Sequence, residues 1–356
     1  MSLDRLRSWM ESEGAVVAFL TSPVSIAYLT GFATNPHERL MALIVREADA
    51  VLVVPGLEEA SATAAARGVS VRAWRDGEDP WAPVAAALGC ISGRVAVEKD
   101  HLSLAGWEQL RVLAGAPQPV DAGVELRRLR ARKTPEEIAR LERAAGLTDA
   151  VTEQALAELR AGRSELEVAA AIDHLIATAG GRPSFETIVQ SGPNSAQPHL
   201  RPGGRRLAPG DLILLDFGAA FEGYRADTTR TVVLGEPDAR QVELHELVLT
   251  AHDAAVAAVR PGATVGDVDE AARAVIRAGG EADRFIHRVG HGLGLEAHED
   301  PSLDPGGSAI LEEGMVITIE PGVYLPGWGG IRIEDDVVVE AGGGRLLTQA
   351  GRTLSS

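Results

Sequence analysis

Cysteine is almost absent from this chain of 356 residues, which contains Cys90 and no other. A single cysteine excludes a disulfide within the chain and a metal site made of several thiolates. Basic residues are in the minority, because 34 Lys and Arg stand against 51 Asp and Glu, for a net charge of −17. Nucleic-acid binding requires a basic surface, so we expect no nucleic-acid partner. An acidic chain suits the binding of cations.

Long apolar runs are missing, since none approaches the ~20 residues that cross a membrane. The first residues, MSLDRLRSWMESEG, are charged and predict an amphipathic helix rather than a signal peptide. We therefore expect a cytoplasmic protein with no membrane partner. No phosphate-binding glycine loop follows the first predicted strand, and no HExxH motif occurs. These absences argue against a nucleotide site at that strand and against a zincin-type peptidase.

Length and composition indicate a soluble globular protein of two domains. Hydrophobic residues make up 45% and charged residues 24% of the chain, and 356 residues exceed one ordinary domain. In the first part, apolar runs alternate with helical patterns, which predicts a three-layer α/β domain over residues 1–122. The predicted strands are 15–20, 41–45, 50–54 and 94–98, and the predicted helices are 23–29, 57–66 and 80–88.

A run of basic residues marks the joint between the domains, and we place the linker at 123–133. Thr134 and Glu137 have the spacing of a capping box, and Pro135 occupies the first helical position. Both features predict that a long helix begins there. The basic side chains either cover a solvated helix face or contact an acidic partner surface, such as a second subunit.

Residues 134–356 form the second predicted domain, and the chain as a whole belongs to the α+β class. A helix pair followed by strands occurs twice, which suggests a duplicated unit with pseudo-twofold symmetry. The predicted helices are 135–159, 165–178, 238–259 and 265–278, and the predicted strands are 211–221, 223–234, 315–320 and 330–340.

Two aspartates are expected to face each other across a hairpin. If the hairpin is centred between Phe221 and Glu222, Asp216 falls opposite Asp227, with their Cβ atoms ~5 Å apart. Two carboxylates in this position repel each other unless a cation lies between them. The apolar neighbours of Asp216 make solvent a poor substitute for that cation. The alternative interpretation is a pair of exposed aspartates near a turn.

Acidic residues also lie at the later apolar strands. Alternation in GIRIEDDVVV places Arg332 and Glu334 on one face, so Glu334 needs either a metal or Arg332 as its partner. Glu320 ends the strand MVITIE directly before Pro321, where a carboxylate is well placed to face a cleft. Each of these acids, taken alone, is more often structural than catalytic.

A glycine-rich segment, GHGLGLEAHEDP at 290–301, carries His291 and His298. Its small residues let an imidazole and the backbone approach a ligand closely. The G-x-G-x-G spacing differs from the dinucleotide-binding G-x-G-x-x-G. One imidazole with four carboxylates forms an oxygen-rich set that suits Mn²⁺, Co²⁺ or Zn²⁺. Bridging carboxylates can hold two such ions about 3.5 Å apart, with an activated water between them.

At these residues the sequence resembles the pita-bread metallopeptidases, which include methionine aminopeptidase, aminopeptidase P and prolidase. The matching segments are PHLRP (198–202), LLDFG (214–218), YRADTTRT (224–231), GHGLGLEAHEDP (290–301) and TIEPGVYLPGWGGIRIEDDVVV (318–339). They occur in the family's order, and TSPVSIAYLTGF (21–32) resembles the amino-terminal domain of prolidase and aminopeptidase P. The resemblance implies a pita-bread catalytic domain preceded by a smaller α/β domain.

The resemblance also implies a role for each site residue. Glu320 would act as general base, His298 would contact the substrate carbonyl oxygen, and His199 would lie on the prolyl side. Arg332 would orient carboxylates, whereas Tyr324 either lines the pocket or only packs. Asp227 and Glu334 would bridge the ions or bind in bidentate fashion. The implied ligands of two divalent ions, Mn²⁺ before Co²⁺ or Zn²⁺, are Asp216, Asp227, His291, Glu320 and Glu334.

Four other histidines receive less weight. We expect His174, His245 and His252 to lie on helices in surface or packing roles, and no role follows for His287.

The implied reaction is hydrolysis of an Xaa-Pro dipeptide, with aminopeptidase P activity on longer peptides as the alternative. Both activities share the catalytic set, and the amino-terminal domain disfavours methionine aminopeptidase. A non-catalytic pita-bread binding protein is a more distant alternative, which the intact ligand set disfavours. The length of the chain favours the dipeptidase.

A dipeptidase must also recognise the free carboxylate of the proline, which calls for a cation. Some relatives place an arginine between the second histidine and the next glutamate, but residues 299–318 contain no Arg or Lys. Family members pair as homodimers in which amino-terminal loops overhang the neighbouring site. Arg39, in the segment NPHERL with His37 and Glu38, is therefore the candidate cation. The alternative is an arginine at the start of the next strand with no substrate contact.

Overall fold

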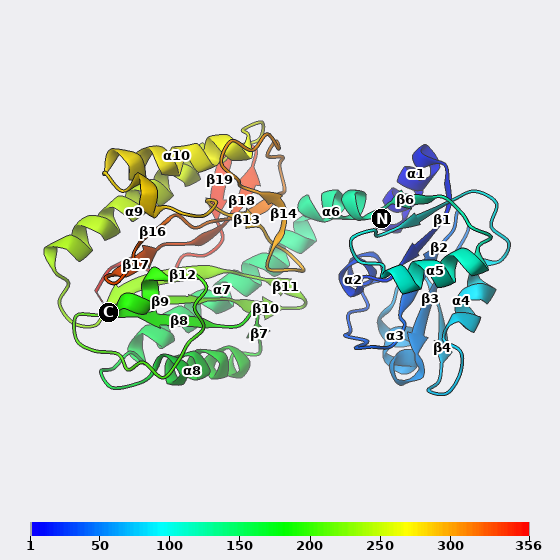
Figure 1. Cartoon of the computed structure of the whole chain (residues 1–356), viewed down its shortest axis with the longest axis horizontal. Coiled ribbons are helices and arrows are strands. Elements are labelled where there is room, and N and C mark those ends of the chain that lie inside the picture. Colours follow the sequence, from blue (N-terminus) through cyan, green and yellow to red (C-terminus); the bar gives the residue numbers. More distant parts are fainter. Residues whose placement is uncertain (1, 356) are drawn as a thin grey trace. The chain divides into compact units, whose positions relative to one another are not determined.

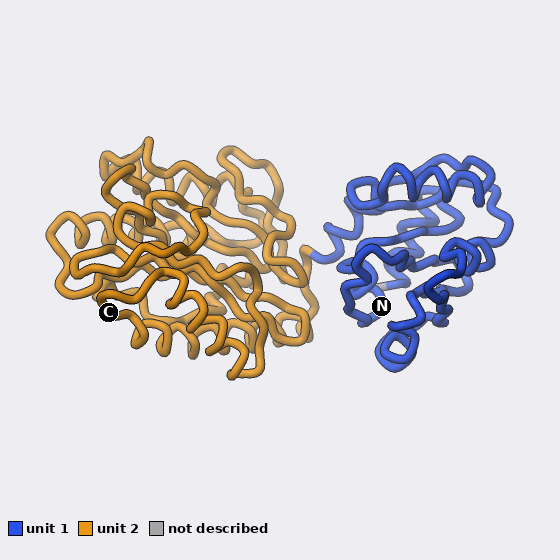
Figure 2. The backbone as a smooth tube through the Cα atoms, turned by 60° about the horizontal axis from the view of Figure 1, so that its bottom comes forward, with its two compact units in different colours: residues 1–130 blue, residues 131–356 orange. Residues whose placement is uncertain are grey.

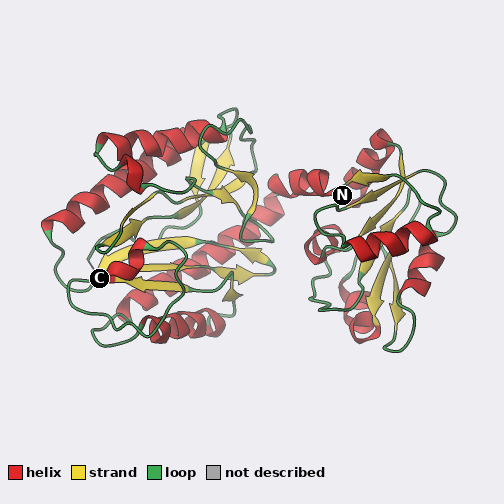
Figure 3. Cartoon of the chain, in the orientation of Figure 1, coloured by secondary structure: helices red, strands yellow, loops and turns green. Residues whose placement is uncertain are grey.

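A computed structural model describes residues 2–355 of the protein (Figure 1). The chain divides into two compact units, Met1–Arg130 and Ala131–Ser356 (Figure 2). Both units combine helices with strands, in agreement with the predicted α+β class (Figure 3). Among the described residues, the helices are all too short or too polar to span a lipid bilayer.

The first unit is a six-stranded sheet with helices on both faces. In the strand order β4-β3-β2-β1-β5-β6, β2 runs antiparallel to β1 and β3, and the other neighbours are parallel. The strands are β1 Ala15–Leu20, β2 Ala42–Val45, β3 Ala50–Pro55, β4 Ser70–Trp74, β5 Arg94–Val97 and β6 Pro119–Asp121. The helices are α1 Ser2–Glu13, α2 Pro23–Thr30, η1 Gly56–Glu58, α3 Glu59–Ala65, α4 Trp81–Leu88, α5 Leu104–Leu113 and α6 Gly123–Ala131.

Alternate side chains of the central strands enter two separate cores, as the period of two in a strand requires. Ala18 and Leu20 pack with α1, α2, α3 and α6. Val17 and Phe19 pack with α4 and α5 on the other face. The predicted three layers are therefore present. The sequence did not reveal β4 and β6, because both are edge strands that are mostly exposed or half-buried and so lack a continuous apolar run.

The segment 123–133, predicted as a linker, is mostly helical, because α6 extends to Ala131. Leu126 belongs to the core of the first unit and holds this helix to it. The division between the units falls after Arg130. The basic run is not simply a solvated face, since Arg130 and Lys133 are both buried.

The second unit combines four helices longer than ten residues with small, mainly antiparallel sheets. Its helices are α7 Pro135–Ala157, α8 Glu165–Thr178, η2 Gly192–Ala196, α9 Ala239–Ala258, α10 Val265–Ala278 and η3 Ala282–Arg284. Its first strands are β7 Arg182–Pro183, β8 Ile188–Ser191, β9 Leu212–Phe217, β10 Ala219–Phe221, β11 Tyr224–Arg225 and β12 Thr228–Val233. Its later strands are β13 His291–Gly292, β14 Glu299–Ser302, β15 Val316–Ile319, β16 Gly322–Leu325, β17 Gly329–Arg332, β18 Asp335–Glu340 and β19 Gly343–Leu346.

Local signals placed the helices well. The predicted capping box forms, because the Thr134 hydroxyl accepts a bond from the Glu137 amide and the Glu137 carboxylate accepts one from the Thr134 amide. Capping boxes also begin α8, α9 and α10. The strand predicted at 330–340 was wrong in one respect, since it breaks between Arg332 and Asp335 into β17 and β18.

The second unit contains an internal duplication, as the helix and strand order suggested. Gly162 donates its amide to Leu207, and Gly262 donates its amide to Leu311, in corresponding bonds before α8 and α10. These two helices begin and end 100 residues apart. Glu320 follows Asp216 by 104 residues, the same separation as between Leu207 and Leu311. The ends of the equivalent strands β9 and β15 therefore contribute equivalent carboxylates to one site.

Candidate metal centre

Asp216 lies in β9 opposite Thr229 of β12, not opposite Asp227. The predicted register was wrong because the chain turns later: Phe221 pairs with Tyr224, and Glu222 and Gly223 form the turn. Their φ angles are 49° and 87°. Positive φ at both central residues is what a two-residue type I′ hairpin turn requires. Asp227 is consequently a diagonal neighbour of Asp216 rather than its direct partner.

Asp227 lies in the short gap between β11 and β12, where its backbone amide donates to the Asp336 carboxylate at 3.1 Å. Its Oδ1 atom is buried and has no hydrogen-bond partner among the described residues. A buried carboxylate oxygen without a donor is costly. This atom therefore has the surroundings of a cation ligand.

His291 is held so that one ring nitrogen faces Asp227 and Glu320. A Cβ atom on the preceding Gly290 would lie 1.9 Å from the Thr318 carbonyl oxygen, so only glycine allows this approach of the backbone. The His291 amide donates to the Thr318 hydroxyl at 3.1 Å, and Nδ1 contacts the Gly292 carbonyl at 3.1 Å. The carbonyl fixes the proton on Nδ1 and leaves Nε2 as an acceptor. Nε2 lies 3.6 Å from Glu320 and 3.9 Å from Asp227.

Glu334 is fixed by β12 through both its backbone and its side chain. Its amide donates to the Thr229 carbonyl at 3.1 Å, and its carboxylate accepts the Thr229 hydroxyl at 2.6 Å. Glu320 is positioned through its own amide, which donates to the Val289 carbonyl at 2.7 Å. The backbone of Glu334 is therefore tied to β12, and that of Glu320 to the segment directly before β13.

These residues form a cluster that fits a divalent metal centre. Asp227, His291 and Glu334 each offer a ligand atom, and these atoms all lie within 4.8 Å of one another. Burial, together with Glu334, Asp216 and other acids, raises the pKa of Asp227 well above its usual range. Burial also raises the pKa of Glu320 to about 7 and, with Glu320 and Asp216 nearby, that of Glu334 well above normal. Cations at the cluster would offset this repulsion.

A chain of polar contacts leads from Asp216 away from the cluster. Arg332 contacts the Asp216 carboxylate and donates to the Thr229 hydroxyl at 3.0 Å and to the Tyr324 hydroxyl at 2.9 Å. The Tyr324 hydroxyl in turn lies 2.9 Å from Nε2 of His287. Tyr324 is buried in this chain of contacts, which differs from a free position in a pocket. His287, for which the sequence indicated no role, is thus part of the site's support.

His287 should make the stability of the protein sensitive to acid. Burial, with Arg332 nearby, lowers its pKa to about 3 from 6.5. Because the unfolded state binds the proton more tightly, stability is complete above about pH 6.5 and decreases as the pH falls toward 3. We expect His287→Gln, whose amide oxygen can still accept from Tyr324, to weaken that decrease. Urea unfolding of the wild type and of His287→Gln between pH 7 and pH 4 gives the free energy of unfolding at each pH. The same dependence of that free energy on pH in both proteins would contradict this expectation.

The two predicted substrate histidines lie on exposed backbone turns at the cluster. The ring centroids of His298 and His291 are 4.0 Å apart. His199 and His298 are both close enough to Asp216 to oppose the rise that burial causes in its pKa. The side-chain amide of Gln190 donates to the carbonyls of Gln197 and Leu200, on either side of His199.

The candidate cation Arg39 is engaged within its own unit. It donates to both oxygens of Asp76 at 3.0 Å and contacts Glu38. Another arginine, Arg288, lies three residues before His291 and was missed in the sequence. Its guanidinium donates to the Ser302 hydroxyl at 2.8 Å, and its charge acts on His298 and Glu320. The signal that pointed to it was its position directly before the glycine-rich segment.

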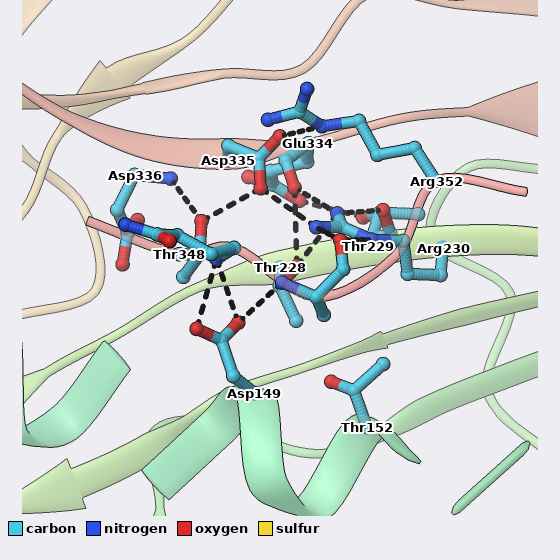
Figure 4. A network of polar contacts seen from close by, with 12 residues as sticks. Asp149, Thr152, Thr228, Thr229, Arg230, Glu334, Asp335, Asp336, Thr348 and Arg352 are labelled. Carbon is cyan, nitrogen blue, oxygen red and sulfur yellow. Dashed lines mark hydrogen bonds and ion pairs between the residues drawn. The ribbon is translucent and has the colours of Figure 1, made fainter. Parts of the chain in front are cut away.

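A buried network of charges holds the backbone of Glu334 and the adjacent Asp335 (Figure 4). Arg230 donates to the Glu334 carbonyl at 2.6 Å and to the Asp335 carboxylate at 2.7 Å, and Arg352 donates to the other Asp335 oxygen at 2.7 Å. His252 also contacts Asp335 at 3.1 Å. Burial opposes the charge of Asp335, but His252 and the two arginines hold its pKa below the usual range. His252 is thus a buried contact of this network, in line with its expected packing role.

The chain matches two protein-family models that together span almost its whole length. Residues 139–341 match metallopeptidase family M24, and residues 3–132 match the creatinase/prolidase N-terminal domain. The chain belongs to metallopeptidase family M24. Over 99% of its length, this M24 metallopeptidase is 41% identical to the putative dipeptidase YkvY of Bacillus subtilis, covering 98% of that protein. It is 38% identical to the Xaa-Pro dipeptidase of Lactobacillus helveticus, with 99% of this chain and 98% of the relative covered.

A solved structure supports the same family and fold. The prolidase from Pyrococcus furiosus superposes with a TM-score of 0.89 at 35% identity, covering 97% of this chain and 100% of that one. This M24 metallopeptidase therefore has the two-domain pita-bread fold that the sequence resemblance implied. Membership in the family implies divalent metal ions, and the cluster of Asp227, His291 and Glu334 provides a site for them.

Proposed function

We propose that this chain hydrolyses Xaa-Pro dipeptides as a metal-dependent dipeptidase. The observation that carries the proposal is the buried cluster whose three ligand atoms lie within 4.8 Å of one another, with Glu320 3.6 Å from His291 and with Asp216 near enough to raise the pKa of Asp227. The similarity along the whole chain to proteins named Xaa-Pro dipeptidase and prolidase supports the same substrate class. We include two Mn²⁺ ions, a homodimer and a cytoplasmic location in the proposal, as expected from the sequence.

Each site residue has a task in this proposal. When bound, two divalent ions polarise the scissile carbonyl and make water a nucleophile at neutral pH. Glu320, whose carboxylate lies 3.6 Å from His291, accepts the proton of the attacking water and passes it to the prolyl nitrogen. His298 donates a hydrogen bond to the substrate carbonyl oxygen as negative charge develops there. Arg332 holds the Asp216 carboxylate in position, and His199 contacts the prolyl side.

The preference for dipeptides can be tested by comparing Leu-Pro with Leu-Pro-Pro. We expect Leu-Pro to be hydrolysed with the higher kcat/KM in the presence of Mn²⁺, and activity to disappear with a chelator. The peptidase reaction depends on cations that the carboxylate cluster holds, so removing them removes the catalyst. Faster cleavage of Leu-Pro-Pro would identify an aminopeptidase P instead. Activity that survives complete metal removal would overturn the mechanism.

The free carboxylate of the dipeptide requires a cation, and Arg288 is the arginine whose charge acts on His298 and Glu320. We expect Arg288→Met to raise the KM for Leu-Pro by roughly 10- to 100-fold, the value of a charge-assisted hydrogen bond. The KM for the prolinamide Leu-Pro-NH₂ should change little, because that peptide carries no carboxylate. Steady-state kinetics with both peptides measure the difference.

Arg39→Ala is the matched variant, because Arg39 is the cation that the sequence suggested. Its ion pair with Asp76 within the first unit leads us to expect an unchanged KM for Leu-Pro. An increase in KM for Arg39→Ala without one for Arg288→Met would show that Arg39, and not Arg288, binds the substrate carboxylate.

A further inference from the structure

The turn that carries His298 is held by a backbone bond and by two side chains of residues outside it. We call residues 294–298, between β13 and β14, the His298 turn. Arg225 binds two of its carbonyls, since the Arg225 amide donates to Gly294 at 2.9 Å and Nε donates to Leu295 at 3.0 Å. The backbone of the turn is therefore fixed by residues outside it.

Glu299 holds the amides of the same turn. One of its carboxylate oxygens, Oε1, accepts the amides of Leu295 at 3.1 Å and Glu296 at 3.2 Å. Bonds from amides to an ionised carboxylate are roughly twice as strong as those to a neutral acceptor. Glu299 is buried, whereas its neighbour His298 is exposed, with its ring centroid 4.0 Å from that of His291. A shift of the Glu299 side chain would therefore displace His298, the adjacent residue.

Lys133 neutralises the other oxygen of Glu299. Its Nζ atom lies 3.4 Å from Oε2, and the two side chains are only 1% and 2% exposed. Nζ also donates to the Ala131 carbonyl at 3.3 Å. A Cβ atom on Gly294 would lie 2.8 Å from Glu299 Oε2 and 3.2 Å from Lys133 Cε, so the turn packs directly on the ion pair.

We propose that Lys133 and Glu299 are positioning residues for hydrolysis, which act by fixing His298 at the metal cluster. A buried ion pair is weak evidence of stabilisation, because desolvation offsets most of the attraction between the charges. Here one partner also binds two amides of the turn whose last residue faces His291. The pair thus fixes the geometry of His298 without ligating metal. This inference rests on the proposed contact of His298 with the substrate.

Glu299→Gln tests the proposal, because it keeps the shape of the side chain and removes its charge. We expect kcat for Leu-Pro to fall about 10-fold or more, as a small misplacement of a catalytic group produces. KM and the metal content of the full-length holoenzyme should remain close to wild type. Hydrogen exchange of the Leu295 and Glu296 amides, followed by mass spectrometry, should become faster.

A double-mutant cycle separates positioning from a general structural effect. If Glu299 acts through His298, Glu299→Gln should change kcat less than about twofold in a His298→Ala background. In a His199→Ala background, used as the matched control, the same substitution should keep its full effect. Equal effects in both backgrounds, or an unchanged kcat in Glu299→Gln alone, would overturn the proposal.

Glu299→Gln removes a negative charge beside the buried Lys133, which is its main risk to folding, and Lys133→Met/Glu299→Gln avoids that risk by removing the positive charge as well. We expect this double variant to regain thermal stability but not kcat. It still lacks the negative charge that strengthens the bonds from the Leu295 and Glu296 amides to residue 299. Recovery of both would show that only the imbalance of buried charge mattered and would reject the positioning role. The assay of the wild-type enzyme distinguishes a failure of this inference from a failure of the proposed function. An enzyme that hydrolyses Leu-Pro, but in which His298 and Glu299 are uncoupled, contradicts this inference and leaves the proposed function intact.

Discussion

Asp227→Asn is expected to abolish Leu-Pro hydrolysis, with a loss in kcat/KM of roughly 1,000-fold or more. The cations held at this cluster contribute several kcal/mol of charge stabilisation in the transition state, and each 1.36 kcal/mol is a factor of ten. The asparagine keeps the shape of the side chain but removes one of the buried negative charges that bind cations. The measurements are steady-state kinetics with added Mn²⁺ and the metal content by elemental analysis.

The same substitution should have the opposite effect on the metal-free protein. Burial and the neighbouring Glu334 disfavour the ionised form of Asp227, so neutral asparagine should leave metal-free stability equal or higher. Asp49→Asn is the control, because Asp49 lies in an exposed pair with Arg46 in the first unit. It should preserve both activity and metal content. A destabilised metal-free Asp227→Asn would mean that this carboxylate has a structural role rather than a metal-binding one.

Arg230→Met is expected to cause the largest loss of stability, about 3–5 kcal/mol in the free energy of unfolding. Its guanidinium is buried and binds carbonyls of Glu334 and Ala350 as well as the Asp335 carboxylate. Removing it leaves Asp335 with one fewer buried counter-charge and leaves several carbonyls without donors. Urea denaturation followed by circular dichroism gives the difference from wild type.

Two further variants delimit this prediction. Arg277→Met removes an arginine from an exposed pair with Glu270, and it should change stability by no more than about 0.5 kcal/mol. Arg230→Met/Asp335→Leu should be less destabilised than the sum of the two single changes, since each single change leaves the other partner of this ion pair behind. Additive losses would show that Arg230 and Asp335 stabilise the protein independently.

Most helices of the second unit were predictable because their signals are local. The extents of α8 and α10 agree with the predictions, since capping residues lie directly before each helix. The duplication also left a signal that was overlooked, because identical residues recur 100 positions apart at Gly162 and Gly262 and at Ile176 and Ile276. The hairpin register was lost because positive φ at Glu222 could not be inferred from residue type.

The sequence by itself supplied the candidate donor set. Four carboxylates and one imidazole on apolar strands and glycine-rich backbone specify a centre for hard or borderline cations, wherever the strands meet. Strand alternation also predicted that Arg332 and Glu334 lie on the same side, and in the structure both bind the Thr229 hydroxyl. These conclusions depend on residue chemistry and on the alternation of side chains along a strand, both of which are visible in a short segment of sequence.

Only the tertiary structure decided which residues support that donor set. Lys133 meets Glu299 and Arg230 meets Asp335, although more than 100 residues separate each pair. Tertiary packing likewise directs the charge of Arg288 toward Glu320 and engages Arg39 with Asp76. Such contacts depend on how distant elements pack and on which charges remain buried once they have packed. Local periodicity contains no record of either, because burial is a property of the folded chain and not of a segment.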